Sequence, residues 1–143
     1  MTKVDKEKVH DLLTRAVDKV YPSKAALEKA LFSGKKIRLY NGMDPSGPDL
    51  HIGHAVVMQK LKEFQELGHE VIWLIGDFTA LSGDPDKTHA RSMMTPAKIQ
   101  SNLKNWKKQA QKLLQFSGKN PIKIKYNNDW LGKLTFTDVV EVA

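Results

Sequence analysis

The chain has 143 residues, 41% hydrophobic and 27% charged, a composition that gives room for one domain with a real core and excludes a disordered protein. No apolar run is long enough to span a bilayer, and the absence of cysteine excludes disulfides and thiolate metal sites, so we expect a cytoplasmic protein with no membrane partner. The formal net charge of +7 favours anionic partners. Much of this excess lies on one predicted helix, where a solvated face explains it as well as an RNA footprint does: Lys98, Lys104, Lys107, Lys108 and Lys112.

Two helices are predicted before the first strand. Apolar residues recur at helical spacing over residues 9–20, and Pro22 stops that helix. A second helix follows, with Ser23 as its N-cap and Gly34 just past its end. We assign residues 1–34 to this N-terminal helical hairpin.

The middle of the chain has the pattern of an α/β fold with a parallel sheet. Buried strands are predicted over 37–40, 71–75 and 122–126, separated by helices over 51–67 and 95–117. The first helix is expected to turn these apolar residues inward: Ile52, Ala55, Val56, Leu61, Phe64 and Leu67. The second, capped by Thr95 and closed by Gly118, is expected to do the same with Ile99, Leu103, Trp106, Ala110, Leu113 and Leu114.

Strand, helix, strand in this length is a crossover unit, so the loops at the carboxyl ends of the strands open into one crevice. We expect residues 35–126 to form a Rossmann-like nucleotide-binding sheet. Residues 127–143 then begin a connecting segment, in which a further helix opens over 136–142. His69 and His89 are expected on the surface.

A polar motif leaves the first strand: Tyr40-Asn-Gly-Met-Asp-Pro-Ser-Gly-Pro-Asp-Leu-His-Ile-Gly-His54. It ends with two imidazoles, His51 and His54, in the first turn of a helix, and Gly53 between them has no side chain to obstruct a ligand. The free N–H groups of a helix N-terminus attract anions, so this end of the helix is a place for a polyphosphate.

A second polar motif leaves the second strand: Gly76-Asp-Phe-Thr-Ala-Leu-Ser-Gly-Asp-Pro-Asp-Lys87. Its Asp84 can bind an ammonium group through its carboxylate. Lys87 and Arg91 lie on a loop that could fold over phosphates. Together with the first motif and the run Asn127-Asn-Asp-Trp130, it resembles the signature of class I aminoacyl-tRNA synthetases, and in particular that of tyrosyl-tRNA synthetases.

The resemblance implies an enzyme that activates L-tyrosine with ATP, accompanied by Mg²⁺, and transfers it to tRNA(Tyr). The catalytic residues that it implies are His51, His54, Ser46, Lys87 and Arg91. Those implied to bind ATP are Gly42, Asp44, Ser46, His51, Gly53 and His54. Those implied to bind tyrosine are Tyr40, Gly42, Asp44, Thr79, Asp84 and Asn127, with Asn127 supporting the pocket from behind.

Plainer interpretations stand beside several of these roles. Tyr40 could be a packed core tyrosine, and Asp44 a turn residue before Pro45. The family more commonly carries Gly-Asp-Pro-Ser-Gly-Lys, and the run here is one residue shorter, so the register of Lys87 and Arg91 is open. Solvated loop charges would account for both residues equally well.

We expect no protein-held metal, because the spacing of His51 and His54 lacks a third ligand and magnesium would be held mainly by phosphate oxygens. The alternatives are another nucleotidyltransferase with the His-Ile-Gly-His motif, a tryptophanyl-tRNA synthetase, or a non-catalytic module that binds RNA or protein through the basic helix.

The resemblance covers nearly all of the chain from about Val17 onward, but only the front part of the family's architecture. We find no KMSKS-like run, and the anticodon-binding domain is also absent, so we expect an N-terminal fragment with little activity alone. The resemblance implies that the full-length enzyme is a homodimer. The following apolar residues lie where a dimer surface or a buried contact with the rest of the sheet would begin: Trp130, Leu131, Leu134, Phe136, Val139, Val140 and Val142.

Overall fold

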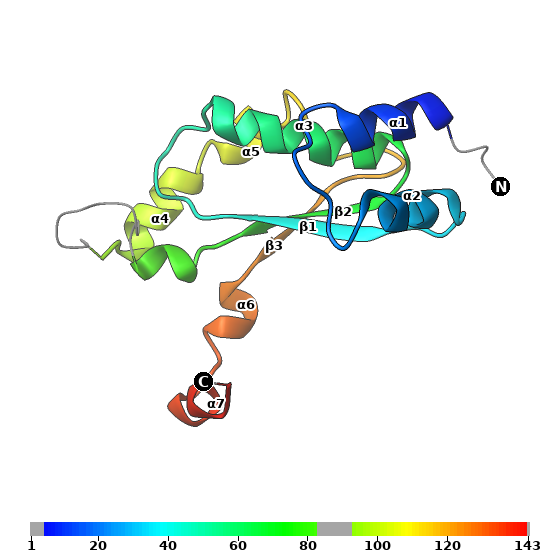
Figure 1. The fold of residues 1–143 in the computed structure, drawn as a ribbon. Coiled ribbons are helices and arrows are strands. Elements are labelled where there is room, and N and C mark those ends of the chain that lie inside the picture. Colours follow the sequence, from blue (N-terminus) through cyan, green and yellow to red (C-terminus); the bar gives the residue numbers. More distant parts are fainter. Residues whose placement is uncertain (1–4, 83–92, 143) are drawn as a thin grey trace.

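A three-stranded parallel sheet forms the centre of the structure, a computed structural model that describes residues 5–82 and 93–142 (Figure 1). Its strands are β1 (Arg38–Met43), β2 (Glu70–Ile75) and β3 (Lys123–Tyr126), in the order β1-β2-β3. All are parallel, with Tyr40 opposite Ile72 and Ile75 opposite Tyr126. The predicted α/β fold with a parallel sheet is therefore confirmed.

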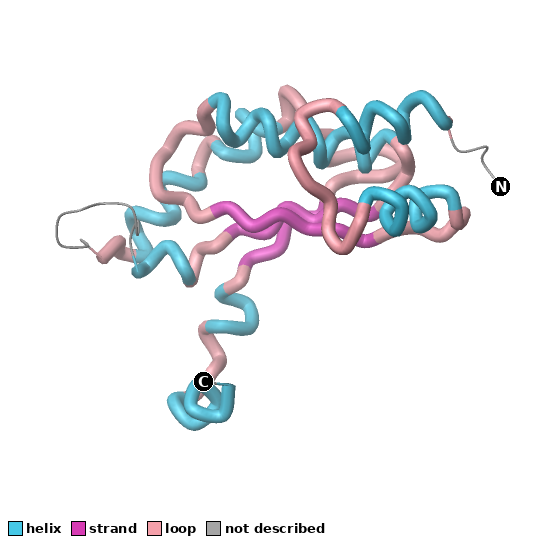
Figure 2. Tube along the Cα trace, viewed as in Figure 1, coloured by secondary structure: helices cyan, strands magenta, loops and turns pink. Residues whose placement is uncertain are grey.

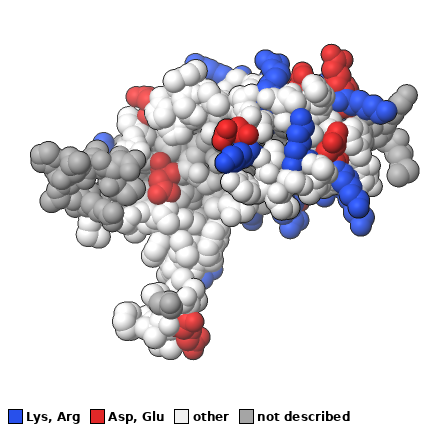
Figure 3. All heavy atoms as spheres, viewed as in Figure 1, with Lys and Arg blue, Asp and Glu red and all other residues white. Residues whose placement is uncertain are grey.

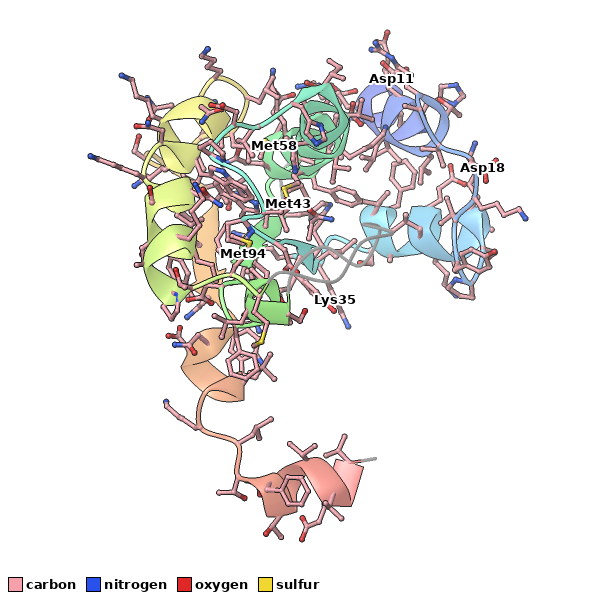
Figure 4. The ribbon with its side chains drawn as sticks, turned by 90° about the vertical axis from the view of Figure 1, so that its left-hand side faces the viewer. Asp11, Asp18, Lys35, Met43, Met58 and Met94 are labelled. Atoms are coloured by element: carbon pink, nitrogen blue, oxygen red, sulfur yellow. The ribbon has the colours of Figure 1, made fainter. Side chains whose placement is uncertain are left out.

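Helices cover one face of this sheet (Figure 2). They are α3 (Ile52–Glu66), which connects β1 to β2, and α5 (Trp106–Ala110). The helix α4 (Pro96–Leu103) precedes α5 in the segment of the chain between β2 and β3, and it lies beside the end of the sheet (Figure 1). Figure 4 shows Met43 of β1 and Met58 of α3 in the interior between sheet and helices. The buried residues of this core are Met43, Met58, Leu61, Val71, Trp73, Ile75, Trp106, Ala110, Leu114 and Ile122.

The opposite face of the sheet is open within the described residues. Side chains alternate along a strand, so Tyr40 lies on the face away from Leu39, and it is 71% exposed. The prediction that Tyr40 belongs to a buried strand is wrong, because its face carries no covering helix here. On the same face the Glu70 carboxylate accepts hydrogen bonds from Lys123 (2.5 Å) and Arg38 (2.7 Å), which lower the pKa of Glu70 to about 2.

The N-terminal helices are α1 (Lys6–Thr14) and α2 (Lys24–Phe32). They pack against α3 and form a second apolar cluster. The buried residues of this cluster are Val9, Leu12, Leu13 and Leu31. The second helix begins after Ser23, whose Oγ accepts from the Ala26 N–H, and Gly34 follows it at φ +73°, as predicted.

The first helix ends earlier than predicted, at Thr14 rather than near Val20. Ala16 has φ +50°, outside the helical region, and the chain then turns back. Val17 and Val20 are still half-buried, so their apolar spacing continued after the backbone had left the helix.

Two further helix predictions need correction. The first two turns of α3 leave Ile52 82% and Val56 52% exposed, although the sequence pattern predicts both in the core. The single helix predicted over 95–117 is two helices, because Asn105 leaves the helical conformation at φ −111°, ψ 0°. The second of them ends at Ala110, well before the predicted end at residue 117. Serine and asparagine are weak helix formers, and Ser101, Asn102 and Asn105 surround this break.

After β3 the chain forms α6 (Asn128–Leu131) and α7 (Phe136–Val142), which project away from the sheet (Figure 1). α7 has the bounds predicted from the sequence. On the face drawn in Figure 3 this projection is largely uncharged. Its exposed apolar residues are Trp130, Leu134, Phe136, Val139, Val140 and Val142. No helix in the ranges 5–82 and 93–142 combines the length and apolar character of a membrane span.

His69, predicted on the surface, is buried at 7% exposure, and its Nδ1 accepts from the Ile37 N–H at 3.3 Å. Burial lowers the pKa of His69, and nearby Lys36 lowers it further. The unfolded chain then binds a proton more readily than the folded one, so stability is full above the ordinary histidine pKa and falls as pH drops through the lowered value.

We expect the free energy of unfolding to decrease below about pH 6.5, with a slope from His69 of at most about 1.4 kcal/mol per pH unit. Urea unfolding of the wild type and of His69→Gln between about pH 7.5 and 5, roughly the range of histidine titration, measures it. The variant should show the smaller slope, whereas His10→Gln, at an exposed histidine, should match the wild type. Equal slopes for all three proteins would refute the prediction.

Candidate active site

The loops after all three strands meet at the carboxyl edge of the sheet through one hydrogen-bond network. The Thr79 hydroxyl, in the short 3-10 helix η1 (Thr79–Ser82), donates to Asp44 Oδ1 at 2.7 Å. Asn127, which follows β3, donates from Nδ2 to Thr79 Oγ1 at 3.0 Å, and its Oδ1 accepts from the Phe78 N–H at 2.9 Å. The structure therefore brings together Asp44, Thr79 and Asn127, three of the predicted site residues.

Gly76 makes this network possible. A Cβ at this position would lie 1.7 Å from Asp44 Oδ1 and 2.5 Å from Thr79 Oγ1, far inside contact distance. Any side chain at residue 76 must therefore displace the Asp44 carboxylate. Sequence reasoning placed Gly76 in the second motif but gave it no role.

The signature turn, residues 44–50, leads from this network to the two imidazoles. His51 is the N-cap of α3, and its Nδ1 accepts from the Gly53 N–H at 3.1 Å. His54 Nδ1 accepts in return from the His51 N–H at 3.2 Å, and the ring centroids are 3.9 Å apart. Because both Nδ1 atoms are acceptors, the neutral rings carry their proton on Nε2, so each offers Nε2–H as a donor.

Partial burial lowers the pKa of the His54 imidazole, and the neighbouring His51 lowers it further. A lowered pKa favours the neutral ring at pH 7, which the acceptor role of Nδ1 requires. The sequence predicted free N–H groups at this helix end. The structure shows that the imidazoles themselves cap two of them, so the pair presents side-chain donors as well as the helix end.

The helices α4 and α5 hold the signature turn from behind. Side chains of Asn102, Trp106 and Gln109 hydrogen-bond its backbone. From sequence, Trp106 was assigned to packing alone, and Asn102 and Gln109 were not singled out. The one available signal was the pair of prolines in the turn, Pro45 and Pro48, because they lack N–H groups and leave carbonyls in need of outside donors.

The remaining predicted residues occupy several places. Tyr40 and Gly42 lie on the open face of β1, and Ser46 is exposed in the turn, its N–H bonded to the Asp44 carbonyl at 2.8 Å. At Gly53 an added Cβ would approach the His51 ring to 3.0 Å, so glycine fits closely there. Three predictions lie outside the described residues: Asp84, Lys87 and Arg91. His89 does as well.

Within the part of the chain that the structure describes, no three or more His, Cys, Asp or Glu side chains cluster in a way that could hold a metal ion. The signature turn and the start of α3 together combine an aspartate, a hydroxyl and two imidazole donors. Such a set can orient a polar ligand and neutralise phosphate charge without an enzyme nucleophile.

Comparison with known proteins decides the family. A model of the family "tRNA synthetases class I (W and Y)" matches residues 33–143, which include the whole sheet and the signature turn. The chain belongs to this family of class I tRNA synthetases.

Among members of the class I (W and Y) synthetases, the chain is 44% identical to a tyrosine--tRNA ligase of Moorella thermoacetica, over 92% of this chain and 32% of that one. It is 43% identical to the same enzyme of Carboxydothermus hydrogenoformans, over 93% of this chain and 33% of that one. The C-terminally truncated mitochondrial tyrosyl-tRNA synthetase of Aspergillus nidulans shares the fold, with a TM-score of 0.76 at 23% identity over 95% of this chain and 41% of that one. The chain thus spans about a third of the length of the curated synthetases that it matches.

Proposed function

We propose that this chain supplies the ATP- and tyrosine-binding face of a tyrosine--tRNA ligase. The substrate carboxylate would attack the α-phosphate of ATP in line, pyrophosphate would leave, and the tyrosyl group would later pass to tRNA(Tyr). The observation that carries the proposal is the signature turn, which joins the Asp44–Thr79–Asn127 network to two imidazoles whose Nδ1 atoms accept from backbone N–H groups, so that Nε2–H is the donor of each ring.

The chemistry of these groups matches the task of adenylation. His51 and His54 can donate to phosphate oxygens, with Ser46 beside them on the turn. Negative charge develops on these oxygens in the transition state, so donors fixed in advance lower the barrier. We propose that Asp84, Lys87 and Arg91 add the ammonium and triphosphate contacts, as the resemblance implies.

The substrate pocket lies, in this proposal, over the open face of β1. Tyr40 is exposed there and free to bond the substrate phenol. Gly42 leaves room for the ligand, because a Cβ added at this position would meet only Leu74 Cδ2, at 3.9 Å. Asp44 would face the nucleotide and the substrate. Asn127, 7% exposed, supports Thr79 and Phe78 from behind the pocket rather than touching the ligand.

Further parts of the proposal concern the whole protein. Magnesium would arrive with ATP and be held mainly by phosphate oxygens. We also propose a cytoplasmic location, homodimerisation of the full-length enzyme, and little adenylation by this chain alone, because no described helix covers the open face of the sheet.

Thermal unfolding with added ligands tests this function. Tyrosine and ATP should each raise the melting temperature, and tryptophan at equal concentration should not, because a ligand bound only by the folded state stabilises it, by about 2.7 kcal/mol at a hundred times its Kd. Asp44→Asn should lose most of the tyrosine effect, whereas Asp49→Asn, exposed on the same turn, should keep it. An equal response to tryptophan would instead support a tryptophanyl enzyme. Steeply salt-dependent tRNA binding with no effect of tyrosine would favour a binding module.

A further inference from the structure

Three side chains of α4 and α5 bind the backbone of the signature turn. Asn102 Nδ2 donates to the Pro45 carbonyl at 2.8 Å, and Trp106 Nε1 donates to the Gly47 carbonyl at 2.9 Å. Gln109 makes two bonds, from Nε2 to the Pro48 carbonyl and from the Leu50 N–H to its Oε1, both at 2.9 Å. These four hydrogen bonds reach the turn from residues 57 to 61 positions away, and the last ends directly before His51.

The turn depends on these outside partners. Two of its seven residues are prolines, which supply no N–H, so it cannot form a regular backbone ladder. The donors stand four and three residues apart, the spacing of one helix face, and they stay aligned across the break at Asn105. One face of α4 and α5 thus supplies a side-chain donor to each of three carbonyls of the turn.

The side chains at this face are more polar than packing alone requires. Asn102 is only 1% exposed, and among the described residues its Oδ1 has no hydrogen-bond partner. A buried amide with an unpaired oxygen is costly, and an apolar side chain of similar size would fill the space at lower cost. The use of asparagine here favours a role for its single bond to Pro45.

Trp106 connects this face to the imidazoles. Its ring stacks on Trp73 of β2 at 6.0 Å between centroids, with an interplanar angle of 5°. The His54 ring also lies near it, at 5.9 Å between centroids. The indole N–H is bonded to Gly47, so one residue contacts the sheet, the turn and the His54 ring.

We propose that Asn102, Trp106 and Gln109 are positioning residues that set the signature turn and thereby fix the tautomer of His51 and His54. Gln109 fixes residue 50, just before the N-cap. The N-cap geometry then keeps each Nδ1 accepting from a backbone N–H, which leaves Nε2–H as the donor of each ring. The identity of the ligand rests on the proposed function, but the imidazole geometry does not.

The variant Gln109→Glu tests this inference. It keeps the shape and the acceptor for the Leu50 N–H, but it replaces the donor to the Pro48 carbonyl with an oxygen that repels it. Gln111→Glu is the matched control, since it makes the same charge change two residues further on at an exposed side chain. Long-range ¹H–¹⁵N NMR of the imidazoles reads the tautomer of each histidine directly, and calorimetry reads the affinity for ATP.

We expect His51 and His54 in the wild type and in Gln111→Glu to show unprotonated Nδ1 at about pH 8, which is above the histidine pKa, and in Gln109→Glu to show mixed tautomers. Affinity for ATP should fall about tenfold or more in Gln109→Glu alone, because displaced donors lose their alignment. Should Gln109→Glu fail to fold, Gln109→Met, which loses both bonds without adding charge, carries the same comparison.

The outcomes are distinguishable. If a folded Gln109 variant shows the same imidazole ¹⁵N chemical shifts as the wild type, the inference is overturned. If the tautomers change as expected but the wild type binds no ATP, the positioning role stands and the proposed function fails.

Discussion

Replacing Gly76 with alanine is expected to abolish most of the ligand affinity of the site while leaving the fold largely intact. The new Cβ would lie 1.7 Å from Asp44 Oδ1, so the carboxylate must rotate away and its 2.7 Å bond from the Thr79 hydroxyl is lost. Asp44 is exposed and can turn into solvent, so we expect the free energy of unfolding to fall by only about 1 kcal/mol. Affinity for tyrosine, measured by calorimetry, should fall roughly a hundredfold, as for groups displaced by about 1 Å.

Two other glycines complete this experiment, Gly47 as its control and Gly42 as a second test of the site. Gly47→Ala adds a methyl group with no heavy atom within 4 Å, so it should bind ligands as the wild type does. We expect the fold to tolerate Gly42→Ala as well, because the heavy atom nearest to the added Cβ is Leu74 Cδ2, at 3.9 Å. Any affinity lost in that variant therefore reports the approach of the ligand to β1. Unchanged tyrosine binding by Gly76→Ala would show that the position of Asp44 has no part in recognition.

Local chemistry explains why some elements could be predicted closely from the sequence. Ser23 and Thr95 cap helices through bonds to N–H groups three residues ahead, and Gly68 takes a positive φ directly after the end of α3. Each of these signals depends on a few neighbouring residues, so no knowledge of the tertiary structure is needed.

Exposure could not be predicted in the same way. Tyr40 and Ile52 sit in apolar patterns, but whether such residues are buried depends on which helix covers which face of the sheet. The pattern of β2 shows the same limit. Its continuous run of apolar residues suggested burial on both faces, and in the structure Ile72 and Leu74 are only half-buried, because their face is open.

Some features of the candidate site could likewise be predicted from the sequence, and others could not. Asp44, Thr79 and Asn127 could be assigned to one crevice because parallel strands bring their carboxyl ends to one edge. The hydrogen bonds from α4 and α5 to the signature turn could not be predicted. Their donors and acceptors are 57 or more residues apart, and the spacing of the donors is that of an ordinary buried helix face. Such long-range polar contacts leave little trace in one sequence beyond the prolines that require them.

The substitution Asn127→Asp should cause the larger loss of stability at this site. Asn127 is 7% exposed, donates to Thr79 Oγ1 and accepts from the Phe78 N–H. A carboxylate keeps the acceptor but removes the donor, and it places a second negative charge across the Thr79 hydroxyl from Asp44. We expect the free energy of unfolding at pH 7 to fall by about 2–3 kcal/mol, the range for a buried polar group left unpaired, more for a charged one.

Urea unfolding measures this change, with Asn128→Asp as the matched control at an exposed neighbour. The loss should shrink at acidic pH, because a protonated carboxyl regains a donor and loses its charge. Tyrosine affinity should fall together with stability, since Asn127 holds η1 and with it the Thr79 hydroxyl that fixes Asp44. If Asn127→Asp and Asn128→Asp were equally stable, Asn127 would not be the residue that joins β3 to the site, and the network would have to be held by β1 and β2 alone.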